Sequence, residues 1–255
     1  RLVGSEMCIR DSPYRGTYVT LLSLDNIKQM IYMRVAVETM VSTDMVVLAG
    51  EVTSRGTVDV VKTAREVIRD IGYTEKGKGF DADTCMIFTN LHNQSPDISM
   101  GVGKGTEGEK EVLGGGDQGI MYGYACGETE QFLPLPVVLA HRLTALLSYV
   151  RTTGQINDLR PDGKAQVSVE YEFGIPQRIA AIVLSCQHAE DKDLSQLREE
   201  LLKVVIKPAL RIFPADENTQ ILINPSGRFV LGGIEADTGL TGRKLMVDTY
   251  GGLAP

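Results

Sequence analysis

Hydrophobic and polar positions along the chain follow two different periods, which predict strands in some segments and helices in others. Residues 34–41 and 45–53 are rich in apolar and β-branched residues and flank the turn-like residues 42–44, a pattern typical of a hairpin. From 60 to 71, apolar residues recur at helical spacing until a glycine, and 84–91 is a third apolar run. The first part of the chain therefore predicts a hairpin, a helix and a strand.

The second part of the chain predicts similar elements in a similar order, with one more helix in front. These elements are a helix at 136–150, strands at 164–173 and 178–186, a helix at 194–205 and a strand at 219–224. Alternate residues from Ala165 to Tyr171 share one apolar face, as in a half-solvated antiparallel strand, and the strand after it is more uniformly apolar. We expect the helix at 194–205 to end at Pro208, because proline cannot donate a backbone hydrogen bond.

Hairpin-paired strands beside separate helices are typical of an α+β chain with repeated modules of mixed or antiparallel sheet and helices on one face, and not of a doubly wound α/β fold. The polar, glycine-rich stretch from 92 to 116 is too long for a plain connection, which favours a mobile loop or lid. The first 12 residues, RLVGSEMCIRDS, lack the layout of a secretion signal and look like translated adaptor sequence. We set them aside as a non-native leader.

Composition then narrows the classes of function. The 255 residues carry a formal net charge of −7, which argues against nucleic acid as the main partner. No apolar run approaches the ~20 residues of a membrane-spanning helix. The four cysteines have no metal-ligand spacing and the chain has three histidines, which argues against a structural zinc site. Unpaired thiols are typical of a cytoplasmic protein.

Two glutamates lie on otherwise apolar strand faces. If Ser42 pairs with Met45 in the predicted hairpin, Glu38 and Glu51 become diagonal neighbours on one face of the sheet. Buried there, they would need a cation, a proton or hydrogen bonds. The alternative is that both are solvated positions on an open face.

Two glycine-rich segments carry possible ligand contacts. Gly103, Gly105 and Gly108 fit the dinucleotide-binding pattern, but no strand leads directly into them and no helix begins there, so we reject that interpretation. We also reject a Walker A loop, because Lys104-Gly105 does not supply its Gly-Lys-Ser/Thr ending. Three glycines precede Asp117, which makes it either a ligand contact in a crowded turn or a residue of a tight glycine turn.

Cations follow several turns. Lys164 comes after LRPDG, Arg228 after NPSG, and Arg243 and Lys244 follow Asp237 in DTGLTGRK. Such cations can converge on a polyphosphate, where arginine binds two oxygens and lysine acts as a point charge. Each of them taken singly is equally compatible with a solvated surface position.

Seven segments together resemble the S-adenosylmethionine synthetase (methionine adenosyltransferase) family, in matching order from about Arg34 to Ala254. They are SPDISMGV, GGGDQGIMYGYACGETE, AHRL, LRPDGKAQVSVEY, VLSCQH, NPSGRFVLGG and DTGLTGRKLMVDTYGG. The resemblance implies the family's three-domain α+β fold. It also implies a transferase that forms S-adenosylmethionine from ATP and L-methionine, with release and hydrolysis of triphosphate.

The resemblance assigns roles to individual residues. It implies methionine-binding positions at Glu51, Gln94, Asp117 and Asp237. It implies ATP-binding positions at Asp162, Lys164, Arg228, Phe229, Asp237, Arg243 and Lys244. Asp117, Lys164, Arg243 and Lys244 are the expected catalytic residues, and Glu38 matches the family's K⁺ ligand. Carboxylates near the forming sulfonium and cations near the leaving triphosphate would stabilise the charges that develop.

The same resemblance divides the chain into modules. After the leader at 1–12, we expect a first module at 13–100, a mobile loop at 101–113, a central module at 114–230 and the start of a third module at 231–255. It further implies a cytoplasmic homodimer, or a dimer of dimers, whose sites are shared between subunits.

Two family segments do not occur in the sequence. No histidine precedes His92, so the Gly-His-Pro-Asp-Lys segment with its Mg²⁺-binding aspartate is absent, as is the later segment with a further lysine pair. We therefore expect a chain incomplete at both ends, inactive alone, from an enzyme that uses Mg²⁺ and K⁺. The alternative is a non-catalytic regulatory or binding homologue that retains the fold.

Overall fold

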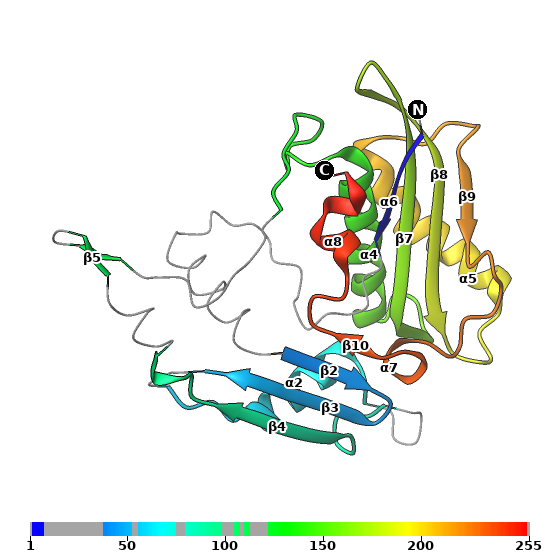
Figure 1. Ribbon diagram of the computed structural model, residues 1–255. Coiled ribbons are helices and arrows are strands. Elements are labelled where there is room, and N and C mark those ends of the chain that lie inside the picture. Colours follow the sequence, from blue (N-terminus) through cyan, green and yellow to red (C-terminus); the bar gives the residue numbers. More distant parts are fainter. Residues whose placement is uncertain are drawn as a thin grey trace.

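The computed structural model describes residues 2–7, 38–52, 56–74, 80–97, 105–107, 110–112 and 122–253. These residues build two four-stranded mixed sheets, each with helices packed against it, together with a small two-stranded hairpin (Figure 1). The fold class is thus the expected α+β class.

The first sheet has the strand order β10-β2-β3-β4. Its elements are β2 (Glu38–Ser42), β3 (Met45–Glu51), α2 (Val60–Ile71), β4 (Met86–His92) and β10 (Gly239–Leu240). The predicted hairpin is confirmed, with Ser42 opposite Met45. The predicted helix is confirmed as well: the Asp59 side chain accepts a hydrogen bond from the Lys62 amide at its start, and Gly72 ends it with a φ of 107°.

The central sheet has the strand order β1-β7-β8-β9. Its elements are β1 (Leu2–Met7), α4 (Leu135–Thr152), β7 (Leu159–Glu172), β8 (Ile175–His188), α5 (Leu194–Leu201) and β9 (Gln220–Ile223). The alternation predicted for 164–173 is confirmed, because Ala165, Val167 and Val169 are buried while their neighbours are more exposed.

The two sheets repeat one topology. In each, a hairpin (β2–β3 or β7–β8) is followed by a helix and then by a strand parallel to the second hairpin strand (β4 or β9). In each, a further antiparallel strand pairs with the first hairpin strand (β10 or β1). The repetition that the sequence pattern indicated is therefore present in the backbone.

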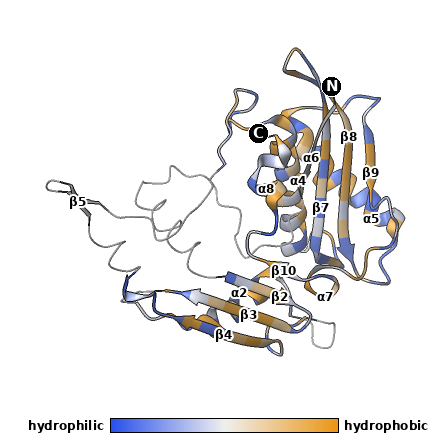
Figure 2. Cartoon of the chain, in the orientation of Figure 1, coloured by the Kyte–Doolittle hydropathy of each residue, from blue (hydrophilic) through white to orange (hydrophobic). Residues whose placement is uncertain are grey.

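The larger core lies between the central sheet and its helices. Leu139 and Leu143 of α4, Ile182 of β8 and Leu197 of α5 are all fully buried in it. Figure 2 shows hydrophobic residues, in orange, along β8 and β9. Each Å² of apolar surface buried in this core stabilises the central module by ~25 cal/mol. A smaller core of Val46, Ile68 and Phe80 joins α2 to the first sheet.

The helix predicted at 194–205 does not end at Pro208. The chain continues as a π-helix (Leu202–Ile206), α6 (Lys207–Ala209) and a 3₁₀ turn (Leu210–Ile212). Proline interrupts a regular α-helix because it lacks the donor that would bond four residues back. A π turn just before it changes the hydrogen-bond spacing, so the helical path passes through Pro208.

Residues 2–7 of the predicted leader form β1, which pairs antiparallel with β7 from Leu2 opposite Glu170 to Met7 opposite Ala165. Without β1, β7 would be an edge strand, and the backbone donors and acceptors of an edge strand can pair with another strand with little regard to its sequence. The assignment of the leader as non-native sequence stays a prediction.

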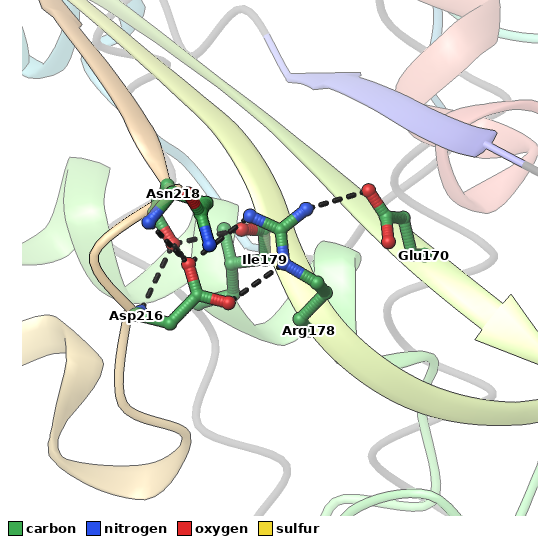
Figure 3. A network of polar contacts seen from close by, with 6 residues as sticks. Glu170, Arg178, Ile179, Asp216 and Asn218 are labelled. Carbon is green, nitrogen blue, oxygen red and sulfur yellow. Dashed lines mark hydrogen bonds and ion pairs between the residues drawn. The ribbon is translucent and has the colours of Figure 1, made fainter.

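A polar network closes the hairpin end of the central sheet (Figure 3). Arg178 on β8 bonds Glu170 on β7 at 2.6 Å and Asp216, which precedes β9, at 2.7 Å. Asp216 also accepts hydrogen bonds from the Asn218 amide and the Thr219 hydroxyl. None of the predicted site residues belongs to this network, so its role is to connect β7, β8 and the entry to β9.

The remaining elements are short. They are β5 (Gly105–Glu107), β6 (Lys110–Val112), α7 (Gly233–Ala236), α8 (Leu245–Asp248) and a 3₁₀ turn at Tyr250–Gly252. β5 and β6 pair with each other inside the stretch predicted as a mobile loop, with Gly105 opposite Val112. That stretch therefore contains a small hairpin in addition to the residues that lie outside the described part.

Candidate functional site

Two of the predicted ATP-binding residues lie at the start of β7. Asp162 is half-buried and Lys164 is exposed, with the buried Gly163 between them. We expected the glycine to form a turn outside the element, but the structure places it within β7, where the register with β8 shifts between Leu159 and Gly163. A bulge of this kind bends the strand locally and changes the direction of its side chains. The sequence pattern of this segment predicts a turn because glycine and proline occur at the bend.

Asp162 connects the central module to the segment that follows residue 230. Its Oδ2 accepts a hydrogen bond from the Gly233 amide at 2.7 Å. Gly233 has a φ of 61°, and a Cβ atom there would overlap the hydroxyl oxygen of Tyr73, which follows α2. A Cβ atom on Gly232 would lie 2.6 Å from the Phe229 ring. Three distant segments therefore meet here with no room for side chains on these two glycines.

Beside this junction lies a cavity of about 80 Å³. Arg151, Arg160, Gln187 and Glu235 are among its lining residues, so both signs of charge face it. The cavity touches all three sequence regions of the junction, but it is small beside the pockets of several hundred Å³ that hold small-molecule ligands.

Arg228 and Phe229 follow β9 through a turn and lie beside the end of β8. The Arg228 guanidinium bonds Glu190 Oε1 at 2.5 Å, and both side chains are exposed. Phe229 is half-buried, and its backbone exchanges two hydrogen bonds with the buried His188. The structure thus brings Phe229 and Asp162 together around Gly232.

Asp237, Arg243 and Lys244 surround β10, which extends the first sheet. β10 pairs antiparallel with β2, with Leu240 opposite Met40. The Arg243 guanidinium turns back to donate a hydrogen bond to the Thr238 carbonyl, next to Asp237. All three predicted residues are exposed. This segment begins only four residues after Gly233, so it continues directly from the junction.

Glu38 and Glu51 lie at the end of the first sheet away from the β2–β3 turn, and Gln94 follows β4 at the same end. Glu38 is opposite Ala49, two residues before Glu51 on the same face, as the hairpin register predicted. Glu51 is in turn opposite His92 of β4, and Gln94 follows two residues later. The His92 and Glu51 side chains approach to 3.4 Å between Nε2 and Oε1.

The two glutamates are not buried in this chain. Both are exposed, with 56% of the Glu51 side chain accessible, so the solvated alternative holds for the isolated chain. Asp237 lies near the hairpin turn, where the Thr43 hydroxyl donates to the Glu235 carbonyl. From there to Glu51 is about seven residue steps along the strands, or about 23 Å at ~3.3 Å per residue. One chain therefore does not bring Asp237 and Glu51 to one ligand.

Asp117 lies outside the described residues, so its environment stays a prediction. Downstream of it, Glu128 accepts hydrogen bonds from the Tyr171 hydroxyl at 2.6 Å and from the Leu135 amide at 2.9 Å. Burial, and next the hydrogen bond to Glu128, raise the pKa of Tyr171. Glu128 thereby fixes the start of α4 against β7, a structural role in the GETE motif that the sequence alone did not suggest.

Sequence reasoning also missed Gln187 and His188, which are 3% and 1% exposed. Both contact the segment 229–230. The sequence feature that could have identified them is the polar pair at the end of the apolar run VLSCQH. Polar side chains at the end of a buried strand require hydrogen-bond partners, so they indicate contacts with another segment.

Among the residues that the structure describes, no three His, Cys, Asp or Glu side chains converge as metal ligands. Glu38 is exposed and lies diagonal to Glu51 on one face of the hairpin, and its predicted role as a K⁺ ligand stays a prediction. No described helix has the length and apolar content that crossing a membrane requires.

The fold and the junction together define a class of protein. It is built of repeated α+β modules, and separate segments of the chain place acidic and basic residues around the boundary between these modules. Family models identify the class further. The S-adenosylmethionine synthetase N-terminal domain matches residues 23–96, the central domain residues 112–229 and the C-terminal domain residues 231–255. The chain belongs to the S-adenosylmethionine synthetase family, as the sequence motifs indicated.

A curated relative agrees with this membership. The S-adenosylmethionine synthase of Pseudothermotoga lettingae is 51% identical over 231 residues, which cover 87% of this chain and 58% of the relative. The chain thus spans little more than half the length of the relative it matches.

Proposed function

We propose that the protein is a methionine adenosyltransferase that forms S-adenosylmethionine from ATP and L-methionine. In this reaction the methionine sulfur forms a bond to the ribose 5′ carbon while the bond from that carbon to the triphosphate breaks. The triphosphate leaves with the bonding electron pair and is then hydrolysed. Family membership and the 51% identical synthase support this proposal.

One observation about the site carries the proposal furthest. The predicted ATP-side segments 162–164 and 228–229 meet around Gly232 and Gly233. The Gly233 amide donates to Asp162, and a Cβ atom on Gly232 would overlap the Phe229 ring. The third predicted segment, 237–244, begins four residues after Gly233. Isolated surface residues would not need to lie close together in space. A ligand as long as ATP, in contrast, needs residues from several segments around it.

The charges of this region suit a departing polyphosphate. Lys164, Arg228, Arg243 and Lys244 are exposed cations on the chain segments that lead into or out of the junction, although Arg228 bonds Glu190 in this structure. Cations placed where negative charge develops lower the barrier, because they need no reorganisation during the reaction. Arg228 would exchange its carboxylate partner for a phosphate oxygen, a ligand of the same chemistry.

The distribution of the methionine-side residues favours a homodimer. Glu51 and Gln94 lie at one end of the first sheet, and Glu51 is about 23 Å along the strands from the hairpin turn near which Asp237 lies. A second copy that contributes Glu51 and Gln94 to the Asp237 end would complete the set. We therefore propose that two subunits share each site, in a homodimer or a dimer of dimers.

Metal ions and location complete the proposal. We propose Mg²⁺ and K⁺ as cofactors, with Glu38 as a K⁺ ligand that requires further oxygen ligands from elsewhere. When bound, these ions would supply positive charge to the phosphates. We also propose a cytoplasmic location, supported by free thiols at Cys85, Cys126 and Cys186 in the described part of the chain.

The proposal is testable with a chimera, since the chain matches only part of its relative. The aligned segment of this chain would replace the corresponding segment of the Pseudothermotoga lettingae synthase, and S-adenosylmethionine would be measured with ATP, methionine, Mg²⁺ and K⁺. We expect product formation. Lys164→Ala should lower kcat/KM by about 100-fold, the loss typical for one group that stabilises transition-state charge.

Lys203→Ala is the matched control, because Lys203 is an exposed lysine on the π-helix, away from the junction. It should leave kcat/KM unchanged. A folded chimera that binds ATP but yields no product would contradict the proposal and favour a non-catalytic homologue.

A further inference from the structure

Three consecutive residues at the end of β8 hold the loop that carries Arg228. Cys186 is bonded at both its backbone amide and its carbonyl by the Asn224 side chain, at 2.8 and 3.0 Å. Gln187 donates from Nε2 to the Val230 carbonyl at 2.9 Å. The His188 amide donates to the Phe229 carbonyl at 3.0 Å. The loop from 225 to 228 is therefore fixed at both ends by the same strand.

The His188 ring adds a bond that defines its protonation. The Phe229 amide lies 3.1 Å from Nε2, and an amide can only donate, so Nε2 is the acceptor. Nδ1 lies 2.7 Å from the Ala189 carbonyl, which can only accept, so Nδ1 carries the proton. The ring is 1% exposed and neutral, with both nitrogens in use.

Gln187 also bonds the second predicted ATP-binding segment, which carries Asp162 and Lys164. Its Oε1 accepts a hydrogen bond from the Asp162 amide at 3.3 Å while its Nε2 bonds Val230. The side chain is 3% exposed. One buried amide group thus joins the segment of Asp162 and Lys164 to the segment of Arg228 and Phe229.

We propose that Gln187 and His188 are positioning residues for nucleotide binding, which hold the segments 162–164 and 228–230 in the relative placement that ATP requires. This inference rests on the proposed function for the identity of the ligand. Neither residue contacts the nucleotide in this proposal. They act through the backbone of Asp162, Phe229 and Val230.

The arrangement is selective for particular side chains. A glutamine at 188 can place its Oε1 close to the position of the imidazole Nε2 and accept from the Phe229 amide, whereas leucine leaves that buried amide unpaired. Methionine at 187 has nearly the shape of glutamine but neither donates to Val230 nor accepts from Asp162. An unpaired buried group favours local opening, which displaces the segment that bears Arg228.

The test uses the 255-residue chain and ATP as the probe. ATP affinity would be measured by calorimetry for the wild type and for His188→Leu, His188→Gln and Gln187→Met. We expect about tenfold weaker binding for His188→Leu, the effect of one lost hydrogen bond, and a loss of at least about tenfold for Gln187→Met, which removes two. His188→Gln should recover binding to within about twofold of the wild type. Ile182→Val, a buried change on the same strand, is the control for general destabilisation and should leave ATP affinity unchanged.

A second measurement does not depend on ATP. Amide hydrogen exchange at Phe229 should become faster in His188→Leu and return to the wild-type rate in His188→Gln. Equal ATP affinities in all four variants, or unchanged exchange at Phe229, would overturn the proposal. A wild-type chain that does not bind ATP would overturn the assignment to nucleotide binding. A chimera that binds ATP normally but makes no product would instead contradict the proposed reaction alone.

Discussion

Gly233 lies where the three sequence regions of the junction meet, and its replacement by alanine tests that junction most sharply. Its φ of 61° belongs to the left-handed region, and a Cβ atom would overlap the Tyr73 hydroxyl oxygen. The change therefore adds backbone strain and a steric overlap at one position. It also disturbs the amide that bonds Asp162 at 2.7 Å.

The free-energy costs of the backbone strain and of the steric overlap can be estimated separately. A left-handed conformation costs a residue other than glycine roughly 1–2 kcal/mol. Overpacking a filled site costs about 1–3 kcal/mol more. For a chain of this size, 1 kcal/mol shifts Tm by about 2–4 °C, so a loss of ~3 kcal/mol corresponds to about 6–12 °C.

The assay is thermal unfolding of a double-mutant cycle. Tyr73→Phe removes the overlapping oxygen and leaves the ring carbon 3.4 Å from the new Cβ, an ordinary contact. Gly233→Ala should then cost only the backbone strain, so the pair should show a coupling energy of about 1–3 kcal/mol. Gly154→Ala is the control, since Gly154 has a φ of 69° and no atom within 4 Å of its Cβ position. Equal losses for Gly233→Ala in both backgrounds would refute the reasoning.

Three further predictions concern the helices and the Arg178 network. Asp59→Ala should cost about 1 kcal/mol in urea unfolding, because the Lys62 amide loses its cap. Leu139→Ala should cost about 2–5 kcal/mol by the same assay, because Leu139 is fully buried. The hydrogen bond from Arg178 holds the pKa of Asp216 below its usual range, so its stabilisation is full above the unfolded carboxyl pKa of ~3.9 and is lost as the pH falls through the lower folded value. Arg178→Met should therefore lower Tm at pH 7 and lower it by a smaller amount near pH 2, and a pH-independent difference would be evidence against the ion pair.

Local sequence patterns were sufficient for most elements. The helices at Val60–Ile71 and Leu135–Thr152 and the hairpin at 38–51 follow from apolar periodicity, a cap and a turn, all of which act within a few residues. Pro208 shows the limit of that reasoning. A rule that proline ends a helix is local, whereas the π turn before it depends on how the buried Val205 and Ile206 pack in the central core.

The candidate site was likewise predictable only in part from local sequence patterns. The sequence motifs named Asp162, Lys164, Arg228 and Phe229, but their proximity comes from contacts across 25 to 71 positions of chain, such as Asp162 with Gln187 and with Gly233. His188 did not emerge as a site candidate, because its importance lies in which backbone groups surround it. Burial of Glu38 and Glu51 was left open, and the structure shows both exposed in the single chain.

By itself the sequence determined the family, the α+β class, the order of elements and the chemistry of the candidate residues, because motifs and periodicity are properties of neighbouring positions. Only the tertiary structure decided which candidates lie close together. Strand register places Glu51 at the end of the first sheet away from the hairpin turn, whereas Asp237 lies near that turn. Hydrogen bonds at the end of β8 bring the predicted ATP-binding segments 162–164 and 228–230 together. Register and long-range bonds depend on the whole core, so no single stretch of residues encodes them.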